Sequence, residues 1–314
     1  MREFLAIPFG WALSGLYSLT DSYLLSIFLL TLIVRLLLLY PSIKQQKNSA
    51  KQVRLNAKVY KIKQKYAGNQ QKIQEETQAL YQREGFGAAN MGCSTLAIQM
   101  IVMIGLYGVI YTPLTSVLKF SSDTVEKLKT ALGIVVTEGS KNTRAASMFE
   151  LQILNKFADN QDKLAGILNA DQIEALERFK DNFNIFGIDL SLTPDREQIS
   201  VLWLIPILAF LTAMASSVFM YFRQRKQNPE MAKNPTMGCM TFMSPFMSLV
   251  FTFMFPAGVG VYWIISNVFS FIQQVVLTSL YSPKKVIAQQ MVDETVVRRS
   301  KENNTKRRVE MEKK

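Results

Sequence analysis

Long uncharged apolar runs alternate with charged segments along this chain of 314 residues. Such runs can cross the roughly 30 Å hydrocarbon layer of a bilayer as single helices. The last block, Asn234 to Pro283, has fifty residues without a charge, and as one helix it would extend about 75 Å. It must therefore turn, and Pro256-Ala257-Gly258 is the natural place. The pattern predicts an all-α polytopic membrane protein with five transmembrane helices: 22–41, 92–114, 199–222, 239–255 and 258–281.

Arg35 is the only charged side chain in the first apolar run, Tyr23 to Tyr40. A central arginine costs a membrane helix about 3 kcal/mol on insertion scales, so it needs a physical reason. One interpretation is snorkelling, because the helix end at Tyr40 lies roughly 7 Å away along the axis. The other is a wet cavity within the membrane, where Arg35 meets a negatively charged group on a substrate. The segment alone leaves both open.

Charge orients the predicted spans. Lys44 to Asn90 has ten Lys/Arg against three acids, Arg223 to Gly238 has four against one, and Ser282 to Lys314 has ten against five. Thr115 to Gln198 has ten Lys/Arg against thirteen acids. Basic loops remain on the cytoplasmic side of a membrane. The pattern therefore predicts an N-terminus outside, a C-terminus in the cytoplasm and a short cytoplasmic loop at 223–238.

Four further segments carry structure outside the spans. Residues 1–21 are predicted to form an external interfacial segment, with a signal peptide as the alternative. In 42–90, helical spacing on both sides of Gly68-Asn69 predicts a cytoplasmic helical hairpin. Its basic face is either a solvated surface near anionic lipid or a mobile docking arm for incoming chains or ribosomal RNA. The enlarged extracytoplasmic loop, 115–198, is predicted to be a small helical cap. Residues 282–314 form a basic cytoplasmic tail with the charge density of a disordered arm.

Composition excludes several kinds of chemistry. The chain has no histidine, so a Ser-His or Cys-His nucleophile pair and imidazole metal sites are ruled out. Cys93 and Cys239 cannot complete a four-ligand zinc site, and on the reducing side of the membrane a disulfide is not expected. Small residues at close helix contacts are the favoured interpretation for both. We expect no enzyme, no cofactor and no metal.

One face of the last predicted span is polar. At 100° per residue, the helix groups a tryptophan with serine, asparagine and glutamine side chains. These are Trp263, Ser266, Asn267, Ser270, Gln273 and Gln274. Gln99 in the second span and Ser216 and Ser217 in the third could line the same space. The alternative is that these side chains form hydrogen bonds between helices in a dry bundle. Arg35 favours a wet groove instead, because a buried guanidinium needs several hydrogen-bond acceptors.

Several stretches resemble the YidC insertase family. SPFMSLVFTFMFPAGVGVYWIISNVFSFIQQ, from Ser244 to Gln274, resembles the last hairpin of that family. RLLLLYPSIKQQKNSAKQ, from Arg35, resembles its first span, LYQREGFGAANMGC the entry to its second, and FGIDLSLTP the segment before its third. The resemblance covers nearly the whole chain in order, and is greatest to the short Gram-positive form without a large external N-terminal domain.

The resemblance implies a function as well as a fold. Members insert and help fold small membrane proteins through a hydrophilic groove, open to cytosol and lipid, with one central arginine. Arg35 occupies that place, Trp263 would line the groove, and Gln99 matches the family glutamine. The family's paired glutamines of the third span correspond here to Ser216 and Ser217, a departure. Together with the polar face, this gives the predicted substrate-binding residues: Arg35, Gln99, Ser216, Trp263, Asn267, Ser270 and Gln274.

The predicted partners are nascent or newly made membrane proteins and membrane lipid. The basic hairpin and tail extend the prediction to the ribosome, the Sec translocon and anionic lipids. The predicted location is the bacterial plasma membrane, crossed several times. Two alternatives remain: a solute transporter that uses Arg35 as the counter-charge for an anion, and an assembly scaffold that inserts nothing.

Overall fold

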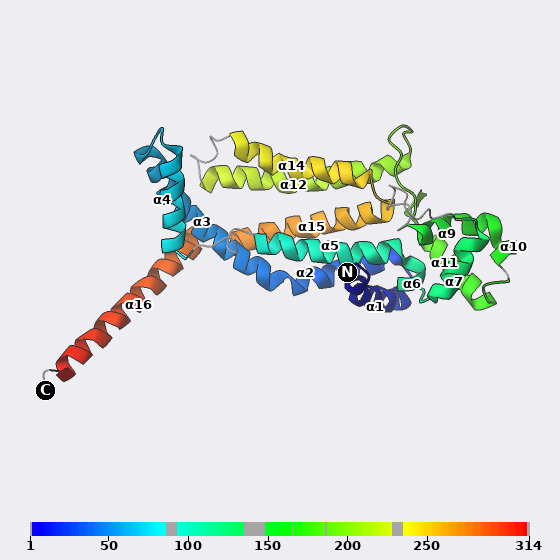
Figure 1. Ribbon diagram of the computed structural model, residues 1–314, viewed down its shortest axis with the longest axis horizontal. Helices are drawn as coiled ribbons and strands as arrows, with labels where there is room; N and C mark the ends of the chain where they lie inside the picture. Colours follow the sequence, from blue (N-terminus) through cyan, green and yellow to red (C-terminus); the bar gives the residue numbers. More distant parts are fainter. Residues whose placement is uncertain are drawn as a thin grey trace. The chain divides into compact units, whose positions relative to one another are not determined.

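The computed structural model describes residues 2–85, 93–134, 148–164, 166–185, 187–227 and 235–312. The chain divides into two compact units. The first comprises Met1–Leu37, Ala97–Tyr221 and Gly238–Phe271, and the second comprises Leu38–Leu96, Phe222–Met237 and Ile272–Lys314. Each unit is built almost entirely from helices (Figure 1).

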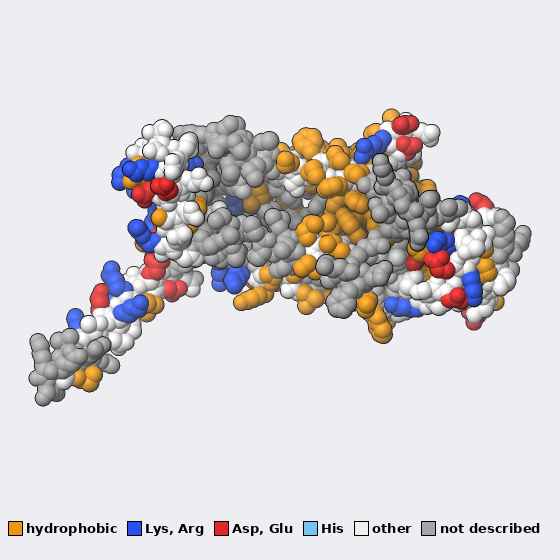
Figure 2. Space-filling view, viewed as in Figure 1, with side chains coloured by type: hydrophobic (Ala, Val, Ile, Leu, Met, Phe, Trp, Pro, Cys, Tyr) orange, Lys and Arg blue, Asp and Glu red, His pale blue; other side chains and the backbone are white. Residues whose placement is uncertain are grey.

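The apolar helices that carry the predicted site lie mostly in the first unit. They are α1 (Arg2–Thr20), α2 (Tyr23–Leu37), α5 (Cys93–Tyr111), α12 (Leu204–Gln227, preceded by the 3₁₀ turn η3, Val201–Trp203), α14 (Pro235–Thr252) and α15 (Ala257–Leu280). Aromatic pairs join neighbouring helices: Phe210 of α12 packs on Phe246 of α14, and Tyr107 of α5 on Trp263 of α15. Figure 2 shows hydrophobic side chains gathered on the surface of these helices. An apolar exterior is typical of helices that face lipid.

Two helices among the described residues are long and apolar enough to cross a membrane, Val201–Gln227 and Ala257–Leu280. A third span results if α2 and the following helix, α3 (Leu39–Lys65), are counted as one broken pair. Pro41 accounts for the break, because a proline ring removes a backbone donor and clashes with the carbonyl four residues earlier, here Leu37. The apolar helices Met100–Tyr111 and Thr241–Thr252 are shorter within the described part. The all-α membrane class is confirmed, whereas the five-span layout stays a prediction.

The segment between α5 and α12 forms a small helical cap. It comprises α6 (Pro113–Ser116), α7 (Ser122–Ala131), α9 (Phe149–Phe157), η2 (Ala158–Asn160), α10 (Gln161–Leu164) and α11 (Ala170–Asn182). Asn169 precedes α11 and forms a capping box with Gln172. The Asn169 side chain accepts a hydrogen bond from the Gln172 backbone N–H, and the Gln172 side chain accepts one from the Asn169 backbone N–H. Such reciprocal bonds satisfy free donors at a helix start.

Aromatic side chains anchor the cap to α1 and α2. Tyr23 of α2 is fully buried and packs on Phe179 of α11 and on Phe183, the residue directly after α11, with ring centroids at 5.5 and 4.3 Å. Tyr17 of α1 meets Phe179 edge to face at 5.2 Å. Aromatic rings bury a large apolar area each, so this cluster fixes α11 against α1 and α2.

A two-strand hairpin departs from the all-helical prediction. β1 (Asn184–Ile185) pairs antiparallel with β2 (Ile188–Asp189) beside Gly187, whose φ of +78° favours glycine. The segment after β2 then receives the start of α15, because Gly258 N donates to the Leu190 carbonyl at 2.8 Å. These bonds satisfy backbone donors at the α15 N-terminus, which the turn at Pro256 exposes.

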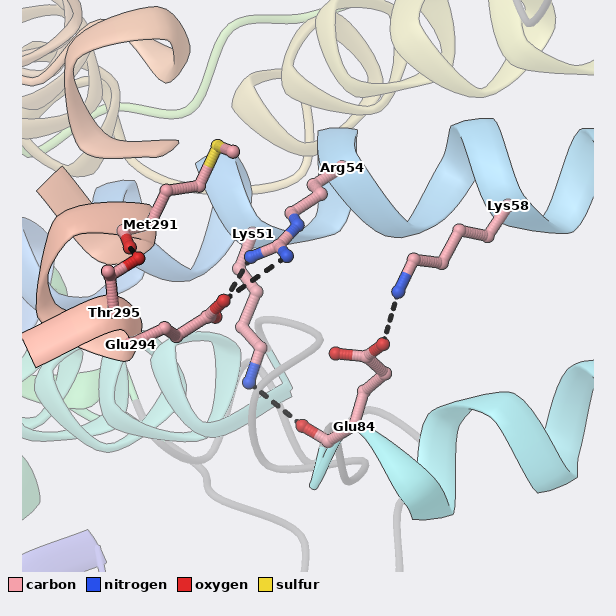
Figure 3. A network of polar contacts seen from close by, with 7 residues as sticks. All are labelled: Lys51, Arg54, Lys58, Glu84, Met291, Glu294 and Thr295. Atoms are coloured by element: carbon pink, nitrogen blue, oxygen red, sulfur yellow. Dashed lines mark hydrogen bonds and ion pairs between the residues drawn. The ribbon is translucent and has the colours of Figure 1, made fainter. Parts of the chain in front are cut away.

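The second unit is a helical hairpin with a long tail helix. α3 and α4 (Gln70–Arg83) are separated by a turn at Gly68, whose φ is +89°. α16 (Pro283–Glu312) packs against α3. Figure 3 shows how ion pairs hold these helices: Arg54 of α3 donates to both carboxylate oxygens of Glu294 at 2.9 and 3.3 Å, and Lys58 of α3 pairs with Glu84.

The tail is therefore a helix, and the expectation of a disordered arm was wrong. After Pro283, which suits the first position of a helix, the segment to Glu312 contains neither glycine nor proline. Its charges also have both signs, as in the Arg298–Glu302 pair one turn apart at 3.5 Å. Such pairs support a helix, whereas like charges alone would extend the chain.

Candidate functional site

Arg35 lies near the end of α2 with its guanidinium directed at α15. Its Nη2 donates to the Ser266 hydroxyl at 2.5 Å and to the Ser266 carbonyl at 3.1 Å. The Arg35 side chain is half-buried and Ser266 is buried. Among the described residues no carboxylate pairs with Arg35. The positive charge is therefore held by neutral oxygen atoms.

Polar groups of α15 surround this arginine. Ser270 donates to the same Ser266 carbonyl at 2.7 Å, so one carbonyl accepts from both side chains. The Tyr262 hydroxyl lies close enough to interact electrostatically with Arg35 and with Tyr107 of α5. Tyr107 is buried, and its hydroxyl has no hydrogen-bond partner among the described residues. A buried hydroxyl without a hydrogen-bond partner costs free energy, so this region favours the binding of a further polar group.

Trp263 belongs to an aromatic cluster on the cap side of Arg35 along α15. Its ring lies 6.3 Å from Tyr107 and 6.3 Å from Phe255, both edge to face, and 5.8 Å from Phe251. The side chain is half-buried. The structure thus joins α5, α14 and α15 at Trp263, one turn before the serine that holds Arg35.

Asn267 and Ser216 are both engaged with α12. The Asn267 amide donates to the Ala209 carbonyl and the Thr212 hydroxyl, each at 3.3 Å. Ser216 donates to the Thr212 carbonyl of its own helix at 3.5 Å. Asn267 therefore makes the kind of interhelical bond that the dry-bundle alternative describes. Neither side chain has a hydrogen bond to Arg35 in the described residues.

The contacts described for this group do not include Gln274 or Gln99. Gln274 lies on α15 in the second unit, half-buried, and its carbonyl accepts from Thr278 at 2.6 Å. Gln99 lies in α5, but its side chain is outside the described residues, as are those of Cys93 and Cys239. The described site thus unites Arg35 with Ser266 and Ser270, and places Trp263 and Asn267 on neighbouring contacts.

Sequence reasoning did not select Ser266 or Tyr262 as site residues. Ser266 belonged to the polar face, and Tyr262 lies four positions before it. Residues four apart share one side of a helix. That spacing was the signal that could have extended the predicted site from Ser270 to Tyr262.

The chain matches the family described as 60Kd inner membrane protein over residues 15–285. It belongs to that family. Its apolar helices and this membership place it in a membrane, and the resemblance read from the sequence is confirmed.

Relatives in the 60Kd inner membrane protein family carry informative names. The chain is 25% identical over 276 residues to Membrane protein insertase MisCA of Bacillus subtilis, covering 86% of this chain and 76% of the relative. It is 23% identical over 288 residues to Membrane protein insertase YidC 1 of Listeria monocytogenes, covering 90% and 74%. A shorter stretch of 100 residues is 37% identical to Membrane protein insertase YidC of Clostridium perfringens, covering 32% and 41%.

Proposed function

We propose that this protein is a membrane-protein insertase, which inserts small membrane proteins and helps them to fold. The names of its relatives support the class of activity. The arrangement at Arg35 supports the mechanism.

The observation that carries the proposal is the incomplete hydrogen bonding of Arg35. A guanidinium has five N–H donors. In the described residues only Nη2 donates, and both bonds end on Ser266. Nε and Nη1 are therefore available for a carboxylate, and a planar guanidinium binds a carboxylate with two parallel bonds. A structural arginine in a dry bundle would need acceptors for these donors as well.

The proposed mechanism lowers the cost of placing charge in a membrane. A hydrophilic groove beside α2 and α15 would admit water and the short N-terminal tail of a substrate. Arg35 would attract acidic residues of that tail, reducing a transfer penalty of several kcal/mol. The apolar segment of the substrate would then move into lipid along α12 and α15, driven by its own hydrophobic free energy. No covalent step and no cofactor is part of this mechanism.

The proposed layout has five spans, with the N-terminus outside and the C-terminus in the cytoplasm. The basic segments that support it include Lys44 to Asn90 and Ser282 to Lys314. In this layout Arg35, Gln99, Ser216, Trp263, Asn267, Ser270 and Gln274 face the path of the substrate. The ribosome, the Sec translocon and anionic lipids would meet the cytoplasmic hairpin and α16.

Reconstitution into liposomes tests the proposal directly. The purified protein is placed in phospholipid vesicles and supplied with a newly synthesised single-span protein, and insertion is scored by protection of the span from protease. We expect insertion that depends on the protein and no flux of small anions. Anion flux without insertion would identify a transporter instead, and neither activity would leave a scaffold; both results contradict the proposal.

A further inference from the structure

A polar cavity lies at the base of the cap, apart from Arg35. It has a volume of about 650 Å³ and lies where α1, the end of α5, α6, α7 and α9 meet. Sites of this size accept small ligands or headgroups. Its polar lining includes Thr112, Ser116, Ser122 and Lys119, and its apolar lining includes Ile7 and Trp11.

Lys119 lines this cavity without an ion-pair partner among the described residues. The two carboxylates in the lining are already engaged: Glu126 pairs with Lys129 at 3.0 Å, and Glu150 accepts three hydrogen bonds from Leu114 and Thr115. In the part of the chain that the structure describes, Lys119 has no carboxylate within ion-pair distance. The cavity therefore offers one free ammonium group to a ligand.

The backbone holds Lys119 in an unusual conformation. Its φ is +59°, in the left-handed region that L-residues with side chains seldom adopt. It lies between α6 and α7, and its Nζ lies over the Trp11 ring at 5.4 Å from the centroid. This cation–π contact keeps the ammonium group beside α1.

The hydroxyl groups of Thr112 and Ser116 also line the cavity. Thr112 and Ser116 share a hydrogen bond at 2.9 Å, and Thr112 donates to the Gly108 carbonyl at 2.8 Å. Ser116 also lies close to Gly10, where an added Cβ would meet the Ser116 Cβ at 3.4 Å. α1 thus approaches α6 closely enough to present its side chains at the cavity.

The wall formed by α1 is apolar and exposed. Ile7 is 56% exposed and Trp11 is 74% exposed. Exposed tryptophan and isoleucine next to a lysine are typical of the interface between headgroups and acyl chains. A ligand in this cavity would therefore have an anionic group against Lys119 and an apolar part along α1.

We propose that this cavity binds the headgroup of an anionic phospholipid, with its phosphate at Lys119 and its first acyl carbons against Trp11 and Ile7. The apolar wall favours a lipid over a hydrophilic acidic peptide, which would gain nothing from that contact. The proposal is independent of the insertase activity, so either can fail without the other.

The test uses the full-length protein in phosphatidylcholine nanodiscs that contain a photoactivatable phosphatidylglycerol. After illumination, labelled peptides are mapped by mass spectrometry. We expect labelling within 6–11 and 112–126. We expect it to fall at least about fivefold in Lys119→Gln and to persist in Lys119→Arg, because a positive charge is sufficient for this contact. The matched control is Lys127→Gln, which removes an exposed charge paired with Asp123 on α7.

Competition distinguishes the possible occupants. Unlabelled phosphatidylglycerol should displace the probe, whereas inorganic phosphate and a soluble acidic peptide should not. Equal labelling by photoactivatable diacylglycerol, which lacks phosphate, would overturn the proposal in favour of non-specific lipid contact. Displacement by the peptide or by inorganic phosphate would also overturn it. Circular dichroism of each variant checks that helix content is unchanged.

Discussion

Two ionisable side chains, the half-buried Arg35 and the buried Glu150, are stabilised in different surroundings. Arg35 is held by the hydroxyl and carbonyl of one serine and retains free donors. Glu150 of α9 is 2% exposed and all its bonds are made within the cap, from Leu114 N at 2.8 Å, Thr115 N at 3.1 Å and Thr115 Oγ1 at 2.6 Å. The first is suited to binding, and the second is a structural anchor at the start of α6.

Glu150 makes a prediction about pH. Burial raises the pKa of its carboxyl above the ordinary value, although the bonds from Thr115 and Leu114 oppose the shift. The folded cap therefore holds this proton to a higher pH than the unfolded chain does. Its contribution to stability is fully present below the ordinary pKa and is lost as pH rises through the raised pKa. Thermal unfolding of the cap should show this loss above pH 4.5.

Two substitutions separate the charge of Glu150 from its hydrogen bonds. Glu150→Gln keeps an acceptor for both backbone donors, so the cap should stay folded and its pH dependence should disappear. Glu150→Ala removes the acceptor of the Leu114 and Thr115 backbone N–H groups, the first of which is buried, and the cap should lose about 1–3 kcal/mol. If both variants unfold alike and retain the pH dependence, another group carries it.

At the scale of elements, α15 has two distinct faces. Val268, Ile272 and Val276 recur every fourth residue and are exposed, at 42%, 52% and 48%. Trp263, Asn267 and Ser270 lie on other parts of the circumference and are half-buried. Since residues four apart share a face, the exposed stripe is the natural lipid-facing side. Val275 is half-buried and therefore makes a poorer lipid-facing control than Ile272.

Site-specific photo-crosslinking tests these faces. A crosslinker at Trp263 or Ser270 should capture a nascent membrane segment stalled on the ribosome, whereas one at Val268 or Ile272 should capture mainly lipid. A crosslinker at Asn267 gives the strictest test, because the Asn267 side chain is hydrogen-bonded to α12 in this structure. Capture from both faces in equal yield would show that the substrate does not follow the polar side of α15.

The contact between α3 and α16 gives a prediction of modest size. The Glu294 pKa is lowered by its hydrogen bond from Arg54, so the pair is fully charged above the ordinary carboxyl pKa. Glu294 is exposed, and exposed pairs contribute at most about 1 kcal/mol. Glu294→Gln should raise hydrogen exchange in 291–297 by less than about fivefold.

Charge reversal supplies the control for this pair. Combining Arg54→Glu with Glu294→Arg should restore the protection lost in either single variant. Glu302→Gln removes a partner within α16 itself and should leave 291–297 unchanged, because Arg298 lies on the same helix. No recovery in the double variant would mean that packing alone holds α16 to α3.

For the whole molecule, the sequence was sufficient for class and family but not for detail. Apolar length predicts the membrane helices, and charge predicts their orientation. Pro41 is evident in the sequence, but the length of the apolar run does not show that the helix breaks at Leu38. The break depends on a clash between the Pro41 ring and one backbone carbonyl. The bonds from Asn267 to α12 and from Arg35 to Ser266 depend on how helices pack, and no spacing along one helix determines that. The helical tail was not predicted because the prediction relied on the net positive charge of the segment and not on the mixture of positive and negative side chains along α16.

The measurement that tests the central claim most directly compares Arg35 variants with two substrates. One carries an acidic N-terminal tail, and the other carries asparagines in place of the acidic residues. Insertion of both is measured in liposomes with wild type, Arg35→Ala and Arg35→Lys, each shown to be folded by circular dichroism. We expect Arg35→Ala to reduce insertion of the acidic substrate by about tenfold, or about 1.4 kcal/mol, while insertion of the neutral substrate is unchanged. Arg35→Lys should retain much of the activity, since an ammonium group also attracts a carboxylate. Equal loss for both substrates in both variants would contradict charge attraction and assign Arg35 a structural role at Ser266.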